Sequence, residues 1–499
     1  LRREHKPRRY LTQYNESSGN FMRRLLALEG IGFYVEHAAG RHTVVFFDDP
    51  QALPALAPES VLKLQSRATS HDHLSHFTWQ SEFATGQYTQ RSYNYKQPDR
   101  VITGTAVAPR AVTALARAGQ LENYRYAESY VDIEGGNLQA GHQMGRAIQR
   151  QQVATGTGTY RHLQPGRRFS VIQVPAGFWQ HAGTECLLTR TRFTADDIHG
   201  DPVFSVELEA APRGIMIYPK ATPSLIEGLQ TAVVTGPKGE EIFTDHLGRV
   251  KVRFHWDRDQ KRPGEKSSCW LRVMQSFAGP NFGAHFTPRI GQEVTIGFEN
   301  GNPDRPFVVG ALYHAEHEPP YGDHQGSRAG FRTRSTKGGS RSTRNELYFE
   351  DAKGKEEFFF QAERDLNSRI KHDDIRDIGN DLDIDIGGDK TVIIGGDDIH
   401  TVGDELTLTA GERILFRVGA SEMEVNPSEV VMRSPQILID GQAMPVGVTL
   451  PTLERPYRLE VTGVTPPATT LAPSTLSGEP ICIECLLSAA AEGSLSVLR

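Results

Sequence analysis

The feature that most constrains this chain is a glycine that returns every eight residues in its C-terminal third. Aliphatic side chains precede most of these glycines, and further apolar residues lie three and five positions after several of them. These offsets differ by even numbers, so in an extended chain the apolar side chains share one face. Each octad therefore predicts a short strand that ends at a glycine able to turn with a positive φ. The glycines are Gly379, Gly387, Gly395, Gly403, Gly411 and Gly419, and the residues before the first four are Ile378, Ile386, Ile394 and Val402.

One such strand has too little apolar surface to be stable alone, a problem that solenoid proteins solve by stacking repeats. Eight residues are too few for a full coil of an ordinary single-chain β-helix. Three interleaved chains avoid this, because each octad then lays one strand across one face of a triangular prism. Neighbouring strands come from different copies, so unpaired edges remain only at the two ends. The repeat therefore predicts an intertwined homotrimeric β-helix over residues 367–445, a rigid needle with Ile386, Ile394 and Val402 facing inward.

Two other interpretations of the repeat are an accidental Gly-Asp-rich loop and a calcium-binding β-roll. The segment GGDKTVIIGGDDIH superficially resembles the Gly-Asp motif of the β-roll. That motif has a period of nine residues, whereas the period here is eight throughout. Six recurrences with matching aliphatic residues also disfavour an accident.

The rest of the chain reads as mainly β structure. Residues 18–29 have helical spacing with Gly30 as a stop, and strands are expected at 31–37 and 42–48. About five short strands within 229–313 suit a small closed barrel of the OB type. These five are expected at 231–234, 250–256, 269–275, 293–298 and 307–312. The expected organisation is a hub-like β-barrel region at 1–225, an OB domain at 226–316, a connector or neck at 317–366, the needle at 367–445, a Pro/Thr-rich linker at 446–480 and a docking tail at 481–499.

Five further blocks of sequence are distinctive: GPKGEEIFTDHLGRVKVRFHWDR (236–258), SCWLRVMQSFAGPNFGAHFTPRIGQEVTIGF (268–298), GNPDRPFVVGALYHAE (301–316), STKGGS (335–340) and NELYFEDAKGKEEFFFQAERDL (345–366). They resemble the valine-glycine repeat (VgrG) spike proteins of type VI secretion systems. The segment at 15–49 is similar to the hub portion of that family, so the resemblance covers roughly residues 10–440. Two departures are an octad array that is short and a hub barrel whose first half is expected to be missing, since the chain begins with Leu1.

The resemblance implies a membrane-puncturing spike, formed by a phage tail hub fused to a needle. As a homotrimer it would sit on the Hcp tube and baseplate and carry a PAAR-type cap or effector. It would assemble in the bacterial cytoplasm, contact the target membrane transiently and be injected into the target cell. Such a device is not an enzyme. The alternative is a spike with a hydrolytic activity of its own, but no catalytic domain is visible beyond residue 440.

Composition excludes several other classes. A formal charge of -6 gives no global attraction to nucleic acid. Four cysteines in 499 residues do not make a disulfide scaffold. No apolar run is long enough to span a bilayer, and no secretory signal is evident.

Two histidine groups could suggest a metal site, but both read as polar loops or connectors, and neither contains H-E-x-x-H. His400 lies on the inner face of the repeat and is expected to be a satisfied core histidine. G-x-S-x-G and P-loop motifs are absent, so no catalytic residue, metal or cofactor is expected. The two groups are His71, His73 and His76, and His314, His317 and His324.

The C-terminal tail follows a Pro/Thr-rich stretch that should be extended. A C-x-x-C pair within it could bind zinc at a trimer tip. The preferred interpretation is an apolar docking peptide for a PAAR-type cap or an effector, as the resemblance implies. The docking residues are Ile481, Cys482, Ile483, Cys485, Leu486 and Leu487.

Overall fold

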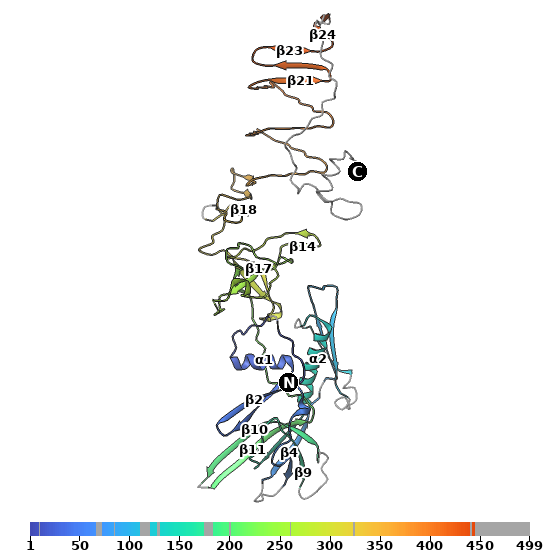
Figure 1. Cartoon of the computed structure of the whole chain (residues 1–499), viewed down its shortest axis with the longest axis vertical. Coiled ribbons are helices and arrows are strands. Elements are labelled where there is room, and N and C mark those ends of the chain that lie inside the picture. Colours follow the sequence, from blue (N-terminus) through green and yellow to red (C-terminus); the bar gives the residue numbers. More distant parts are fainter. Residues whose placement is uncertain are drawn as a thin grey trace. The chain divides into compact units, whose positions relative to one another are not determined.

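The computed structural model describes residues 1–444, except 9, 66–71, 84, 110–119, 127–129, 174–182, 199–200, 260, 323–324 and 440–441. The linker and docking tail predicted at 446–499 therefore lie outside the described residues. The chain divides into two compact units, Leu1–Lys371 and His372–Arg499, which Figure 1 traces along the colour bar.

The first unit begins with the predicted helix and hairpin. Helix α1 (Ser18–Glu29) starts at Ser17, whose side chain accepts a hydrogen bond from the Asn20 amide. It ends at Gly30, whose φ of 68° is the left-handed conformation that glycine adopts without penalty. Strands β1 (Gly32–Ala38) and β2 (Arg41–Phe47) then pair antiparallel, so all three predicted elements are confirmed.

Six strands of the first unit close into a barrel in the order β10-β11-β8-β4-β3-β9. Their alternating apolar side chains fill its interior, with Leu62, Leu74 and Val206 completely buried. Closure removes the unpaired edges that an open sheet would leave. The strands are β3 (Val61–Leu64), β4 (Leu74–Ser81), β8 (Gln152–Gly158), β9 (Arg168–Gln173), β10 (Glu185–Ile198) and β11 (Asp201–Pro212).

A three-stranded sheet and the long helix α2 (Ile133–Gln151) complete the hub region. The helix packs against β6 at Gly104, where a Cβ would collide with the backbone of Gly136. These two glycines therefore allow the helix to approach the sheet closely. The sheet has the order β6-β5-β7, from β5 (Gln87–Ser92), β6 (Ile102–Val107) and β7 (Glu122–Tyr126).

The predicted OB region contains a four-stranded sheet of order β13-β12-β16-β17. Four of the five expected strands are present. The fifth, at 269–275, appears as two single bridges, Val250 to Leu271 and Val273 to Val308, which connect the segment to the β13 and β17 sides of the sheet. The strands are β12 (Gln230–Thr235), β13 (Lys251–Phe254), β16 (Glu293–Phe298) and β17 (Pro306–Ala311), and a small hairpin of β14 (Ala278–Gly279) and β15 (Phe282–Gly283) precedes β16.

The neck region holds an antiparallel sheet that the sequence did not predict. Its order is β18-β19-β20, formed by β18 (Arg328–Arg332), β19 (Glu346–Glu350) and β20 (Glu357–Gln361). The first strand lies in a Gly- and Arg-rich stretch that reads as an exposed connector, because glycine and arginine are weak strand formers.

The second unit contains the repeat and, after it, an antiparallel meander. The meander joins β21 (Ile414–Val418), β22 (Ser421–Val425) and β23 (Val430–Arg433), and Gly419 with φ 54° lies in its first turn. A short pair follows, β24 (Ile437–Ile439) with β25 (Gln442–Met444). Figure 1 labels β21, β23 and β24 at the orange end of the colour scale.

Candidate functional site

The octads that precede Gly411 form no sheet within one chain. Over residues 372–412, all of which are described, there is neither a strand nor a backbone–backbone hydrogen bond. Burying a backbone N–H or C=O group without a hydrogen-bond partner costs free energy, so the groups of this segment need partners from outside the segment. Either water or other chains must supply them.

The exposure of the large apolar side chains in this segment follows the predicted two-residue period. Ile378, Ile386 and Ile394 are 44%, 44% and 46% exposed, whereas Ile393 and Ile399, at positions of opposite parity, are both 81% exposed. The positions of opposite parity also hold most of the acidic residues. The segment is thus amphipathic, with an apolar face that its own chain leaves largely open. The acidic residues of that second set include Asp381, Asp383, Asp385, Asp389, Asp397 and Glu405.

The expectation of positive φ at the octad glycines is wrong for most of them. Of the six glycines, Gly419 alone has φ in the left-handed region, and it belongs to the meander hairpin. The other five turn without it, and a Cβ added at any of them would meet no atom within 4 Å of this chain. Neither the backbone conformation nor the space within one chain therefore requires glycine at these positions. The five are Gly379, Gly387, Gly395, Gly403 and Gly411.

The histidines singled out from the sequence that the structure describes are not assembled into a metal site. His400 is 71% exposed and lies 3.0 Å from Asp398. His314 and His317 face each other across a tight turn with ring centroids 4.4 Å apart. Among the described residues, no group of three or more His, Cys, Asp or Glu side chains is arranged to hold a metal ion. His71 and His324 lie outside those residues.

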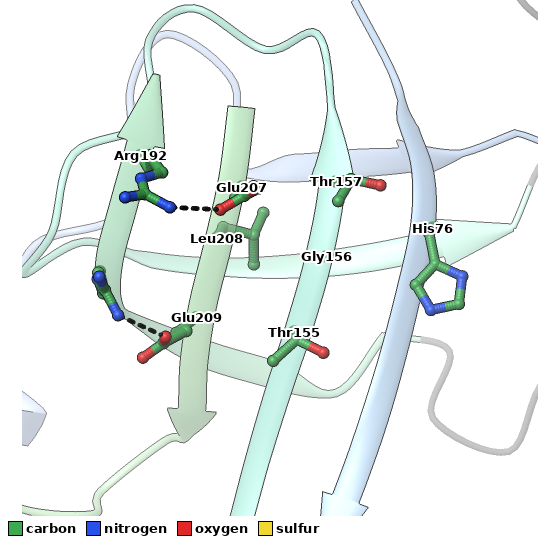
Figure 2. Close-up of a pocket in the computed structure, with 9 residues that line it drawn as sticks. His76, Thr155, Gly156, Thr157, Arg192, Glu207, Leu208 and Glu209 are labelled. Atoms are coloured by element: carbon green, nitrogen blue, oxygen red, sulfur yellow. Dashed lines mark hydrogen bonds and ion pairs between the residues drawn. The ribbon is translucent and has the colours of Figure 1, made fainter. Parts of the chain in front are cut away.

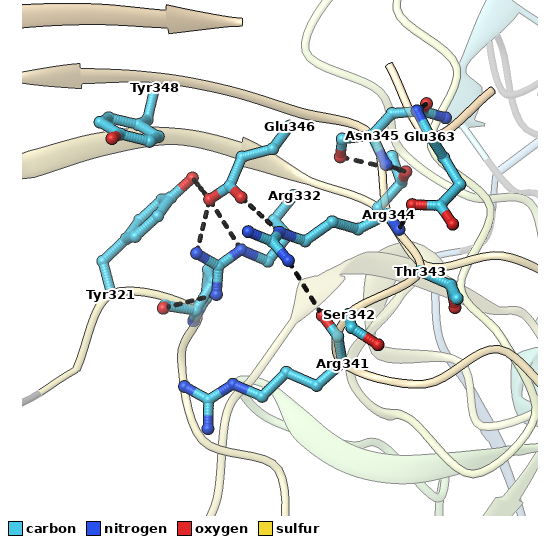
Figure 3. Close-up of polar contacts among 12 residues, drawn as sticks. Tyr321, Arg332, Arg341, Ser342, Thr343, Arg344, Asn345, Glu346, Tyr348 and Glu363 are labelled. Atoms are coloured by element: carbon cyan, nitrogen blue, oxygen red, sulfur yellow. Dashed lines mark hydrogen bonds and ion pairs between the residues drawn. The ribbon is translucent and has the colours of Figure 1, made fainter. Parts of the chain in front are cut away.

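A buried ionic cluster in the neck was not found from the sequence. The Glu346 carboxylate is 1% exposed and accepts hydrogen bonds from Arg332, Arg344 and Tyr321. Both guanidinium groups have nitrogen atoms 2.5 Å from its oxygens, and Figure 3 marks these contacts with dashed lines. Burial alone would raise the pKa of Glu346, but these hydrogen bonds outweigh it and hold the pKa below its ordinary value.

Beside this cluster, a broad groove of about 1220 Å³ lies between the OB domain and the neck. Exposed apolar side chains line part of it, including Met274, Phe286 and Leu312, and Arg332 and Arg341 line another part. The groove is wide and open, and within it the Thr287 hydroxyl lies 3.3 Å from Nε2 of His285. It has the character of an interaction surface.

A smaller pocket of about 240 Å³ lies on the hub barrel, over β8, β10 and β11 (Figure 2). Its charged side chains are paired across neighbouring strands, with Arg190 3.0 Å from Glu209 and Arg192 3.8 Å from Glu207. His76 on β4 is hydrogen-bonded to Thr78 at 2.6 Å. The two ion pairs are ordinary cross-strand pairs of a solvated sheet face, the His76–Thr78 pair lies within one strand, and the three do not form a catalytic arrangement.

Within the described part of the chain, none of the helices combines the length and apolar character that crossing a bilayer requires. The predicted docking residues of the tail, from Ile481 to Leu487, lie beyond residue 444 and thus outside the described residues.

Three family profiles match consecutive parts of this chain. The phage tail baseplate hub (GPD) family matches residues 1–198. The injector OB domain of type VI secretion systems and phage baseplates matches 232–313. The bacteriophage T4 gp5 C-terminal trimerisation domain matches 329–433. The first range contains the hub barrel strands except β11, the second contains most of the OB sheet, and the third contains the octads and nearly all of the neck sheet.

Relatives that align with 76% of this chain bear spike or toxin names. The type VI secretion system spike protein VgrG1c of Pseudomonas aeruginosa is 34% identical over 393 residues, which are 76% of this chain and 53% of that protein. The actin cross-linking toxin VgrG1 of Vibrio cholerae is 31% identical, over 76% of this chain and 35% of that protein. The chain thus spans about half the length of VgrG1c.

Among solved structures, an Escherichia coli component of the type VI secretion system aligns with a TM-score of 0.37 at 21% identity. The alignment covers 60% of this chain and 62% of that protein, which is described as structurally similar to the T4 bacteriophage tail proteins gp27 and gp5.

Proposed function

Because this chain belongs to the VgrG family of type VI secretion spike proteins, we propose that three copies of it form the puncturing spike of a contractile secretion machine. The hub barrels and OB domains would form the wide base. The octads would wind together into the needle that enters the target envelope.

The open octad segment is the observation that carries this proposal. Most of its apolar side chains lie on one face, and its backbone finds no backbone partner in its own chain. Other copies of the same segment offer both missing contacts, an apolar face and unpaired strand edges. The match of residues 329–433 to a trimerisation domain supports three as the number of copies.

The proposed action is mechanical. Interchain strand ladders have to break together before the needle deforms, so the prism can concentrate force at a narrow tip. The described residues offer no catalytic constellation to add to this. The actin cross-linking relative extends well beyond the region it shares with this chain, so its name carries no activity over to these residues.

The proposed partners are the Hcp tube and baseplate at the base, and a PAAR-type cap or effector at the tip. They follow from family membership and from the apolar tail at 481–487. In this proposal the spike assembles in the cytoplasm and leaves the cell when the sheath contracts.

The mass of the purified full-length chain tests the proposal. Multi-angle light scattering should give three times the chain mass of 55.4 kDa, and circular dichroism should show an intact β signal. A stable monomer with the same β signal would contradict the spike assembly. Calcium should leave the unfolding midpoint unchanged, whereas a calcium-dependent rise would favour the β-roll alternative.

A further inference from the structure

The neck sheet β18–β20 has two faces of opposite chemistry. One face carries charged and polar side chains that are paired across the strands, such as Arg328 with Glu350 and Tyr348 with Glu357. The other face is apolar along every strand. The strand registers align Ala329 with Phe349 and Phe358, and Phe331 with Leu347 and Phe360.

The burial of these two faces is the reverse of the usual pattern. On the polar face Glu346 and Tyr348 are only 3% and 7% exposed, while on the apolar face Phe358 and Phe331 are 64% and 59% exposed. Phe349 and Phe360 are about half exposed as well. Large contiguous apolar patches of this kind mark interaction sites, because leaving them in water sacrifices the free energy that their burial would provide. In the isolated chain, therefore, the polar face of the neck sheet is covered and its apolar face is exposed to solvent.

The apolar surface continues onto the OB domain of the same chain. Phe286 stacks on Phe331 with ring centroids 5.5 Å apart, and the β14–β15 hairpin beside it exposes Phe277 and Phe282. In the other direction along the chain, the sheet leads after ten residues into the octads, which need partners of their own.

We infer that the aromatic face of the neck sheet is an interchain core, occupied by the same face of two further copies, and that this core sets the register of the three chains. The inference rests on the proposed trimeric spike. The region matched by the trimerisation domain begins at Ala329, inside β18, so the aromatic face and the octads belong to the same matched stretch of sequence. A further copy of this chain is the favoured occupant, because it would cover the aromatic face and would also bring the octads with which the octads of this chain can pair.

A non-repeating contact is needed to fix the register of the three chains, because the octad repeat specifies that register only weakly. A slip of one octad moves a chain by eight residues, an even number, so each side chain keeps its inward or outward orientation. The inward residues before the glycines are also nearly interchangeable, since Ile378, Ile386 and Ile394 are identical. The neck face has no repeat, and any slip there would separate the stacked Phe349 and Phe358 from matching positions in the other copies.

Spin labels on the needle can test this in the full-length protein. The label is attached to D397C, on the outer face of the octads, in a chain with Cys269, Cys482 and Cys485 replaced by serine. In-register chains should give a single distance between labels. The double variant F349S/F358S should add further distances, and the protein concentration at which half of the trimer dissociates should rise by about tenfold or more. F83S is the matched control, because Phe83 is also 64% exposed but lies in the hub; it should change neither quantity.

The outcomes separate the two proposals. A monomeric parent protein would end the proposed function and this inference together. A trimeric parent whose double variant keeps one label distance and the same dissociation concentration would overturn the inference alone. Should the double variant lose its β signal, F358S decides by the same two criteria, since that ring is mostly exposed in the single chain. F349L/F358L should retain the single distance because both positions remain apolar.

Discussion

At the scale of single residues, two buried groups hold the first unit together in ways that no sequence pattern indicates. Glu346 bridges Arg332 and Arg344 beneath the neck sheet. His142, on α2, is 3% exposed and its Nδ1 lies 3.0 Å from the Leu28 carbonyl at the end of α1, so that nitrogen carries a proton and donates. Each of these contacts joins different secondary-structure elements: His142 links α2 to the end of α1, and Glu346 links β19 to β18.

Replacing Glu346 should destabilise the neck strongly. E346Q removes the negative charge and leaves the guanidinium groups of Arg332 and Arg344 beside a neutral side chain. Removing one partner of a buried ion pair in this way typically costs about 3 kcal/mol or more. E240Q is the control, since Glu240 forms an exposed pair with Lys337 at 2.8 Å and surface pairs contribute at most about 1 kcal/mol. Chemical denaturation should show a lower midpoint for E346Q alone. Equal midpoints would mean that the buried cluster adds no stability.

His142 should make the hub sensitive to acid. Burial lowers the pKa of His142 to about 4, from 6.5. Between these values the unfolded chain binds a proton that the folded chain does not, so the free energy of unfolding falls as pH drops below 6.5, by up to about 3 kcal/mol. H142Q should flatten this dependence between pH 7.5 and 4.5 in urea denaturation. H246Q should not, because the His246 side chain is 79% exposed; an unchanged slope in H142Q would contradict the assignment.

At the scale of elements, what matters is where each segment finds its hydrogen bonds. The helix α1, the barrel strands and the meander β21–β23 find theirs within the chain. Residues 372–412, which hold most of the octads, do not. Local pattern therefore defines the octad strand, and in the proposed trimer the other copies would complete it.

The octad glycines should matter only in the assembled needle. A Cβ at Gly395 or Gly403 meets no atom of its own chain within 4 Å, so the cost of valine there is expected to come from contacts between copies. G395V/G403V should weaken the trimer by about 1–3 kcal/mol per site, the usual cost of overpacking, measured as a fall in the temperature at which trimer mass is lost. D397N, at an outward position, should leave that temperature unchanged. Equal tolerance of all three substitutions would count against the prism.

At the scale of the whole molecule, assembly and cargo are expected to be separable. The neck and octads would hold the copies together, while the tail at 481–499 would bind the cap or effector. Deleting the tail should abolish co-purification of a PAAR-type protein from the same gene cluster and leave the trimer mass unchanged. A deletion that retains the cap would contradict the docking role.

The chemistry of the tail can be tested separately. I483S/L486S should lose the cap if the tail docks through apolar contacts, whereas C482S/C485S should keep it. The reverse pattern, with zinc measured by elemental analysis in the parent protein, would favour the metal-binding alternative.

The sequence by itself determined the β-rich class, the OB strands, the α1–β1–β2 segment and the octad face, because each depends on a spacing that repeats over a few residues. The hub and needle family was also evident from long ordered blocks. The sequence predicted a full strand at 269–275, but the segment forms only two isolated bridges, at Leu271 and Val273. The alternation of apolar residues does not reveal how many ladder hydrogen bonds a segment makes.

The tertiary structure decided what local pattern cannot encode. The Glu346 cluster joins side chains from three segments, and the inverted neck sheet emerges only when strand register and burial are known together. The turns at five octad glycines proved not to need a left-handed conformation. The physical reason is the same in each case: these features depend on which groups meet across the chain or between chains, and spacing along one strand does not record that.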